Sequence, residues 1–237
     1  MDDQGAKMPV TVGFDVYGTL IDTHGVVVTL QQMVGSRAAD FSRVWRDKQL
    51  EYSFRRGLMQ QYENFTICTR HALDYTCSYF KTPLDREQRD KLLAVYRVLP
   101  AFDDVKECLA RFSSGDFRLY AFSNGSADAI ETLLVSAGIR AFFHDVVSVD
   151  EVKSFKPNPG VYCHFLRRTG SSGSEAWLVS SNPFDVIGAI SSGMKSAWVQ
   201  RSAEAIFDPW GIEPTITVPD LSLLAEQIAS YRSTTAP

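Results

Sequence analysis

The stretch VTVGFDVYGT, residues 10–19, decides the fold of this chain. Its first part is an apolar run rich in β-branched residues, which predicts a buried strand, and Gly18 and Thr19 predict a tight turn directly after it. One carboxylate, Asp15, interrupts the run near its end. A carboxylate inside an apolar strand costs free energy unless hydrogen bonds hold it. Asp15 therefore either caps the turn or belongs to a functional site.

The residues after this turn have a different character. Residues 22–98 show helical periodicity and almost no strand signal, with Phe41 and Trp45 one helical turn apart. A helix is predicted over residues 85–97, opened by acidic residues that suit a helix start, and Pro100 marks a boundary after it. We expect a helical unit between the first strand and the rest of the chain.

Beyond Pro100, predicted helices and strands alternate. Strands are predicted at residues 118–123, 144–150, 176–181, 195–200 and 215–218, and helices at residues 103–113, 127–137, 159–168 and 185–192. Parallel neighbours need crossovers of about a dozen or more residues, so these strands make a parallel sheet. The sequence predicts an α/β fold: a doubly wound, Rossmann-like core of residues 1–21 and 99–237, with a helical cap of residues 22–98 inserted after the first strand.

Composition excludes several classes of protein. The 237 residues are 45% hydrophobic and 22% charged, with a net charge of -4 and no basic run, so a nucleic-acid partner is not expected. No apolar stretch approaches the roughly 20 residues of a membrane span, and the first residues lack a secretion signal.

The 4 cysteines show no CxxC pair, which favours reduced thiols in the cytoplasm. The 4 histidines have no triad or metal pattern, and we expect them in loops or at the surface.

Polar residues follow several predicted strands. Ligands of such sheets bind outside the carboxyl ends of the strands, where Asp15, the pair Ser123 and Asn124, and residues 180–182 are expected. Each has an ordinary structural explanation: residues 123–125 as a turn and helix cap, and Asn182 and Asp185 as caps of the next helix. Because all of these residues are expected at one edge of one sheet, together they predict a ligand site.

Together these residues resemble the haloacid dehalogenase superfamily. The signatures are DxxGT at residues 15–19, SNG at residues 123–125, KP at residues 156–157 and SSNxxD at residues 180–185, in the family's order. The resemblance covers nearly the whole chain. It implies that Asp15 is a nucleophile, and it gives a role to Lys156, which would otherwise be read as a surface lysine.

The L-2-haloacid dehalogenase branch looks closest. WRDKQLEYSF at residues 45–54 and LMQQYENF at residues 58–65 read like that branch's helical cap. Superfamily phosphatases usually carry a second aspartate two residues after the nucleophile, where this chain has Tyr17. A halide leaves without a proton, so no such acid is needed. Asn182 stands where phosphatases often have a magnesium-binding acid, so we expect no metal and no cofactor.

The resemblance implies a two-step displacement on Asp15. Ionised Asp15 attacks C2 of the substrate and forms an ester. Lys156 keeps Asp15 ionised, because a neighbouring cation favours a charged carboxylate. Thr19 and Ser180 orient Asp15 and Lys156 through their hydroxyl groups.

Hydrolysis of the ester and binding of the halide involve five further residues. Asp185 is expected to act as the base that activates water, with Asn182 assisting. Arg46 from the cap and Asn124 from the core match the family's halide-binding donors. The ring edge of Phe184 lies beside them, without the indole N–H of a tryptophan.

The resemblance also implies a substrate pocket. The substrate carboxylate is expected to bind Ser123 and nearby backbone N–H groups, and its C2 substituent to meet Leu50, Phe65 and Tyr17. Tyr162 either hydrogen-bonds Lys156 or Asp15 or simply packs on the sheet.

The expected activity is therefore hydrolytic dehalogenation of short-chain (S)-2-haloalkanoic acids to (R)-2-hydroxyalkanoic acids. Two alternatives stay open: a magnesium-dependent phosphatase of the same superfamily, and a relative that binds small acids without turnover. The resemblance also implies a homodimer, which no motif in the chain demonstrates.

Overall fold

A parallel β-sheet forms the centre of the molecule in a computed structural model that describes residues 9–112 and 116–235. Among these residues six strands pair in the order β3-β2-β1-β4-β5-β6, each parallel to its neighbours. The strands are β1 (Val10–Phe14), β2 (Phe117–Ser123), β3 (Asp145–Ser148), β4 (Ala176–Ser180), β5 (Lys195–Val199) and β6 (Ile216–Val218). This order is that of a doubly wound sheet, which confirms the predicted fold class.

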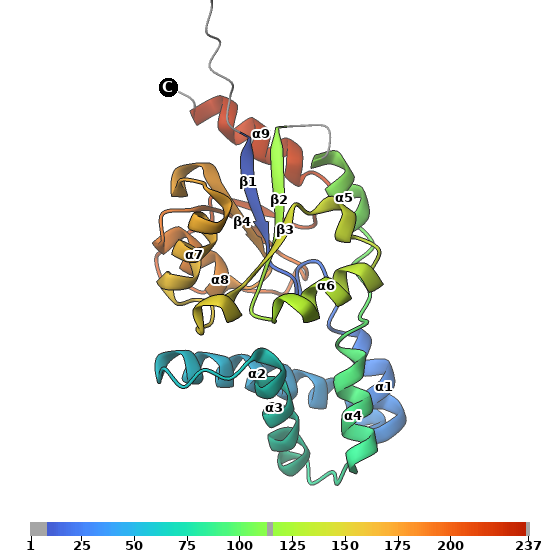
Figure 1. Cartoon of the computed structure of the whole chain (residues 1–237). Helices are drawn as coiled ribbons and strands as arrows, with labels where there is room; N and C mark the ends of the chain where they lie inside the picture. Colours follow the sequence, from blue (N-terminus) through green and yellow to red (C-terminus); the bar gives the residue numbers. More distant parts are fainter. Residues whose placement is uncertain (1–8, 113–115, 236–237) are drawn as a thin grey trace, which may run out of the picture.

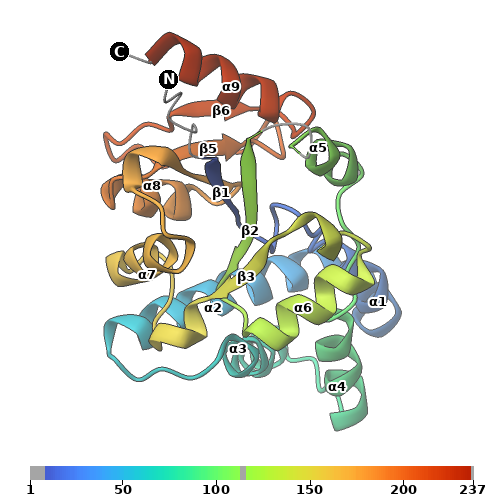
Figure 2. The same ribbon diagram turned by 45° about the horizontal axis from the view of Figure 1, so that its top comes forward.

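Helices cover both faces of the sheet (Figures 1 and 2). One face carries α5 (Val105–Phe112), α6 (Ala127–Ser136) and α9 (Leu224–Thr235), and the other carries α7 (Pro159–Thr169) and α8 (Pro183–Ser191). In the middle of β1, a Cβ atom at Gly13 would stand 2.7 Å from the ring of Phe165 in α7. A glycine at this position therefore lets α7 approach the sheet closely.

Four helices lie between β1 and α5 in the chain: α1 (Gly25–Val34), α2 (Ala38–Leu58), α3 (Phe65–Tyr79) and α4 (Arg86–Val95). They form a separate layer facing the carboxyl ends of the strands (Figure 1). Its two connections to the core are hydrogen-bonded to each other, from the Asp22 N–H to the Pro100 carbonyl at 2.9 Å and from the Phe102 N–H to the Leu20 carbonyl at 3.0 Å. These bonds lie at the two ends of the predicted cap, whose boundaries stay a prediction.

Most predicted strands and helices agree with the structure to within a few residues; one helix was not predicted, and one expectation was wrong. Helix α9 was not predicted, because few apolar residues mark its buried face. His164, expected in a loop or at the surface, lies in α7 and is only 9% exposed, with its ring 3.2 Å from the Glu151 carboxylate. The N-terminal end of the predicted core, residues 1–8, and Ser113 lie outside the described residues.

The described part of the chain contains no helix long and apolar enough to cross a membrane. All four cysteines are free, and Cys163 is the one that is exposed.

Candidate active site

A small cavity lies at the carboxyl ends of β1, β2 and β4, under the helical layer. Ten residues line it, and all ten belong to the predicted site. The core contributes Asp15, Tyr17, Ser123, Asn124, Lys156, Asn182 and Phe184, and the helical layer contributes Arg46, Leu50 and Phe65. The other predicted residues, Thr19, Ser180, Tyr162 and Asp185, lie behind this lining. We call this space the reaction cavity.

Asp15 follows β1 directly and is 7% exposed. Its Oδ2 atom accepts hydrogen bonds from Asn182 Nδ2 at 2.8 Å, from Thr19 Oγ1 at 2.9 Å and from Ser180 Oγ at 3.4 Å. Its Oδ1 atom accepts one, from Lys156 Nζ at 3.2 Å. Four donors thus replace the water that burial removes from this carboxylate. Asn182, expected to assist hydrolysis of the ester, is bonded to Asp15 itself.

Lys156 is 1% exposed, and its ammonium group lies between two carboxylates. Nζ donates to Asp15 Oδ1, to Asp185 Oδ2 at 2.8 Å and to the Phe122 carbonyl at 2.9 Å. It also lies 4.2 Å from the centroid of the Phe122 ring. All three ammonium donors are used, so this buried cation is fully compensated. Neither Thr19 nor Ser180 contributes to it, although both were expected to orient it.

Asp185, at the first turn of α8, is 0% exposed. Its pKa is raised to about 6, chiefly by burial and also by the charge of Asp15, against the opposing effect of the Lys156 charge. The Tyr162 hydroxyl donates to Asp185 Oδ1 at 2.8 Å. Of the two alternatives left open for Tyr162, a bond to Lys156 or Asp15 is not the one formed: its ring is buried, and its hydroxyl bonds Asp185. A Cβ atom at Gly188 would stand 2.5 Å from that hydroxyl oxygen, so only glycine leaves room for the contact.

Arg46 and Asn124 both line the reaction cavity, Arg46 from the helical layer and Asn124 from the core. Arg46, in α2, is oriented by a bond from Nη1 to Gln49 Oε1 at 2.9 Å and a long contact from Nη2 to the Tyr17 carbonyl at 3.5 Å. Asn124 Oδ1 accepts the Lys156 backbone N–H at 2.9 Å, which fixes the amide. Phe184 packs against a cap residue, Phe54, with ring centroids 4.9 Å apart. The guanidinium group and the amide can both donate to an anion in this cavity.

Sequence reasoning missed Gln49, which is 0% exposed in the interior of the helical layer. Its Nε2 donates to Thr69 Oγ1 at 2.5 Å while its oxygen accepts from Arg46. A signal was present, because Gln49 continues the four-residue spacing of Phe41 and Trp45. A polar residue on an otherwise apolar buried face needs a partner, and here the partner belongs to the site.

Ser181 was expected at this edge of the sheet but was given no role. Its N–H donates to Thr19 Oγ1 at 2.9 Å, and its hydroxyl donates to the Gly18 carbonyl at 2.8 Å. Gly18 has a φ of 84°, a conformation that favours glycine. These bonds fix the turn after β1 and aim the Thr19 hydroxyl at Asp15.

The donor set does not fit a magnesium ion. Mg²⁺ requires oxygen ligands in octahedral geometry, but an ammonium group occupies the space between Asp15 and Asp185, and Asn182 presents its amide nitrogen to Asp15. Within residues 9–112 and 116–235, no group of three or more His, Cys, Asp or Glu side chains is arranged to hold a metal.

Comparison with known proteins identifies clear relatives. Residues 10–193 match the family model described as haloacid dehalogenase-like hydrolase. Haloacetate dehalogenase H-2 of Moraxella sp. (strain B) is 36% identical over 92% of this chain and 97% of its own length. The (S)-2-haloacid dehalogenase of Pseudomonas sp. (strain YL) is 35% identical over 91% and 92%. The structure of L-2-haloacid dehalogenase from Xanthobacter autotrophicus with chloropropionic acid covalently bound aligns with a TM-score of 0.86 and 31% identity, covering 94% of this chain and 99% of that one.

Proposed function

Because this chain belongs to the haloacid dehalogenase-like hydrolases, we propose that it hydrolyses short-chain (S)-2-haloalkanoic acids to (R)-2-hydroxyalkanoic acids through an ester on Asp15. One observation carries the proposal. A single buried ammonium group, that of Lys156, lies between two carboxylates, of which only Asp15 faces the reaction cavity. The names of the similar enzymes support the substrate class.

In the first step Asp15 Oδ1 attacks C2 of the substrate from the side opposite the halogen. Three donors hold Oδ2, whereas Oδ1 has only the Lys156 contact, so Oδ1 is the better nucleophile. The new C–O bond forms as the carbon–halogen bond breaks, and the halide leaves with the electron pair. Arg46 and Asn124 donate to it. Attack from the opposite side inverts C2, which converts an (S)-substrate into an (R)-product.

In the second step water adds to the ester carbonyl carbon of Asp15. Negative charge develops on Oδ2, where Thr19, Ser180 and Asn182 already donate. Asp185 accepts the proton of the water. Ester formation removes the charge of Asp15, and with it the repulsion that raises the pKa of Asp185, so Asp185 is ionised at neutral pH when the base is needed. Collapse of the adduct breaks the bond to Oδ1 and expels the hydroxy acid, whose alkoxide takes the proton held by Asp185. Asp15 releases the second proton of the water to solvent and is restored as a carboxylate with one oxygen from water.

The remaining lining residues suit a small carboxylic acid. Ser123 is placed to receive the substrate carboxylate, while Tyr17, Leu50 and Phe65 surround the C2 substituent. Tyr162 is 0% exposed behind Asp185, so we assign it a positioning role and not a substrate contact.

Chloride release from (S)-2-chloropropionate tests the proposal. Purified protein in EDTA is expected to release chloride and form (R)-lactate, with little turnover of the (R)-substrate. Magnesium-dependent hydrolysis of p-nitrophenyl phosphate without chloride release would contradict the proposal and favour a phosphatase. Stabilisation by the acid on heating, with no product, would favour a binding protein.

We predict that Tyr162→Phe shifts the pH dependence of kcat. A base must be ionised, and loss of the Asp15 charge in the ester lowers the pKa of Asp185 from its value of about 6, so parent kcat is expected to fall only at a pH below about 6. The Tyr162 hydroxyl stabilises the ionised form of Asp185, and its loss raises that pKa. The midpoint of the kcat profile should rise by about one unit, which corresponds to about 1.4 kcal/mol. Tyr120→Phe is the control, because Tyr120 packs in the same apolar cluster. An unchanged midpoint in Tyr162→Phe would show that Asp185 is not the titrating base.

We predict that Arg46→Lys lowers kcat for (S)-2-chloropropionate about 100-fold, the usual effect of removing one donor to a developing anion. Lysine keeps the positive charge but lacks the planar guanidinium group, which can donate to Gln49 and to an anion in the reaction cavity at the same time. Arg55→Lys in the same helix, with a side chain 63% exposed, should stay within about twofold of the parent. Full activity of Arg46→Lys would remove Arg46 from the halide site.

We also propose that the protein is a cytoplasmic homodimer. Free cysteines fit a reducing compartment. Leu58, Met59 and Tyr79 of the helical layer and its loops are 88%, 59% and 61% exposed, and exposed apolar side chains suit contact with a second copy. Sedimentation should give twice the chain mass, and Leu58→Glu should give the monomer. A monomeric parent protein would contradict this.

A further inference from the structure

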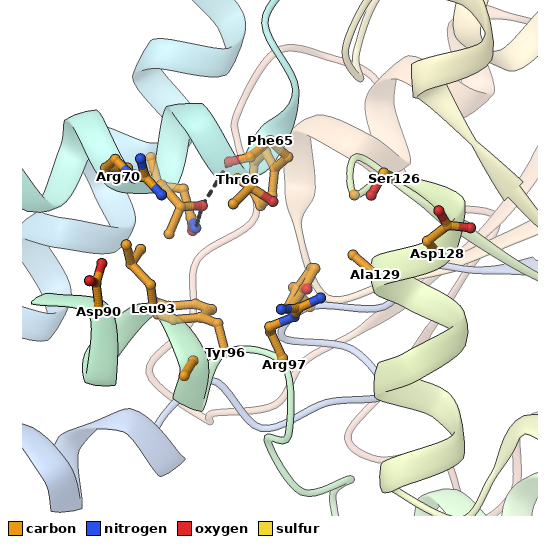
Figure 3. A pocket seen from close by; sticks show the side chains of 15 residues that line it. Phe65, Thr66, Arg70, Asp90, Leu93, Tyr96, Arg97, Ser126, Asp128 and Ala129 are labelled. Atoms are coloured by element: carbon orange, nitrogen blue, oxygen red, sulfur yellow. Dashed lines mark hydrogen bonds between the residues drawn. The ribbon is translucent and has the colours of Figure 1, made fainter.

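A second cavity lies beside the reaction cavity, between α3, α4 and the start of α6 (Figure 3). Its volume is about 370 Å³, ample for a short carboxylic acid. Its walls include Thr66 and Arg70 of α3, Leu93 of α4, Arg97 just after α4, and Ser126 and Ala129 at the start of α6. We call this space the outer cavity.

The reaction cavity is too small to admit a substrate as it stands. Its volume is about 10 Å³, which is about the space of one water molecule. A haloacid can reach Asp15 only if side chains of the lining move.

Two aromatic rings separate the cavities. Tyr17 and Phe65 are the residues, among those described, that line both spaces, and their ring centroids are 6.0 Å apart. No described residue hydrogen-bonds the Tyr17 hydroxyl, so packing alone holds this ring. Side chains held by packing change rotamer at little cost when an apolar ligand replaces the lost contacts. These two rings are therefore the part of the wall that opens most easily.

Positive charge lies on both sides of this wall. Arg97 lines only the outer cavity and Arg46 only the reaction cavity. The pKa of Tyr17 is raised to about 12, chiefly by burial and also by Tyr96, whereas the charges of Arg46 and Arg97 both lower it. Both guanidinium groups thus act on the ring that separates them. An anion that passes Tyr17 leaves one cation and meets another.

The acidic residues of the outer cavity lie away from this path. Asp90 of α4 pairs with Arg86 at 3.7 Å, and Asp128 lies on the far wall in α6 (Figure 3). Arg97 extends into the space between these walls, and no described carboxylate pairs with it within 4 Å.

We infer that the outer cavity is an entry subsite for small carboxylates, where Arg97 receives the substrate before the Tyr17 and Phe65 rings move aside and admit it to Asp15. This inference rests on the proposed function.

Blocking the outer cavity tests the route. In a Cys163→Ser background, Ala129→Cys places a thiol on the cavity wall, and Val135→Cys places one on the same helix at a position 64% exposed and outside the lining. Benzyl methanethiosulfonate on Ala129→Cys should lower kcat/KM for (S)-2-chloropropionate at least tenfold, with recovery after reduction by dithiothreitol. The methyl reagent on Ala129→Cys, and the benzyl reagent on Val135→Cys, should stay within twofold of the unlabelled variants.

A binding measurement tests the subsite without catalysis. Propionate, which carries no halogen, should slow the labelling of Ala129→Cys and leave the labelling of Val135→Cys unchanged. Arg97→Gln should remove this protection, whereas Arg43→Gln, at an exposed arginine of α2 that pairs with Asp40 and Asp47 outside the lining, should keep it.

The outcomes separate the two proposals. Full kcat/KM in the benzyl-labelled Ala129→Cys enzyme overturns the entry route while leaving the proposed function intact. Protection by propionate without any chloride release from the parent protein supports the subsite and contradicts the proposed function. Absence of protection overturns the subsite.

Discussion

Replacing Asp15 by asparagine is expected to abolish chloride release from (S)-2-chloropropionate, with a loss on the order of 10⁴-fold or more. An amide oxygen is a poor nucleophile, and the new amide would also place a donor or an uncharged oxygen against Lys156 and Asn182, which now bind a carboxylate. Initial rates are to be measured on fresh protein whose mass excludes deamidation. Asp22→Asn, outside the reaction cavity and with a side chain 32% exposed, should retain parent activity.

Isotope labelling examines the same carboxylate directly. A single turnover in H₂¹⁸O with enzyme in excess should place ¹⁸O in the Asp15 side chain, because water attacks its carbonyl carbon and the attacking Oδ1 leaves with the product. Mass spectrometry of the peptide that contains Asp15 reads the label. Appearance of ¹⁸O in lactate during that first turnover, with unlabelled Asp15, would mean that water attacks C2 and that no ester forms.

Replacing Lys156 by methionine is expected to remove activity and also much of the stability. The variant keeps Asp15 and Asp185 buried and close together but removes the cation between them. Breaking a buried ion pair by deleting one partner costs about 3–5 kcal/mol, because a buried charge is left without compensation. Urea unfolding at pH 7 should show a loss of this size, and chloride release should be undetectable.

The stability of Lys156→Met should also depend on pH in a defined direction. In the parent, Lys156 lowers the pKa of Asp185 against the effect of burial, so its removal raises that pKa above about 6. A folded-state pKa above the unfolded value of about 3.9 means that the folded protein binds more protons. The variant should therefore gain stability as pH falls from 7 towards 4, relative to the parent.

Lys153→Met is the matched control for this variant, because Lys153 lies three residues earlier with its side chain 65% exposed. Its stability should stay within about 0.5 kcal/mol of the parent. If Lys156→Met unfolds at the parent urea concentration at pH 7, the two carboxylates do not depend on this ammonium group.

The sheet could be predicted from the sequence because its signals are local. A β-branched apolar run, a turn glycine and helical spacing between runs are all visible within short windows of the chain. Neither the role of Gln49 nor the helix α9 was predicted from the sequence, for related reasons. Gln49 is a polar residue on an apolar helix face, and the buried side of α9 is marked by few large apolar residues beyond Leu224 and Ile228.

The sequence by itself determined which residue types stand at the carboxyl ends of the strands: an acid after β1, an amide after β2 and a serine–asparagine pair after β4. Only the tertiary structure decided their partners. Asp15 and Lys156 are 141 positions apart, and their contact depends on strand register and on the close packing of α7 and α8. Tertiary packing also brings the Tyr162 hydroxyl to Asp185, in the space that Gly188 leaves free. It places the rings of Tyr17 and Phe65 between the outer cavity and Asp15. The order of motifs along the chain does not give the distances between their side chains, because hydrogen bonds of about 3 Å arise only when distant segments are packed against one another.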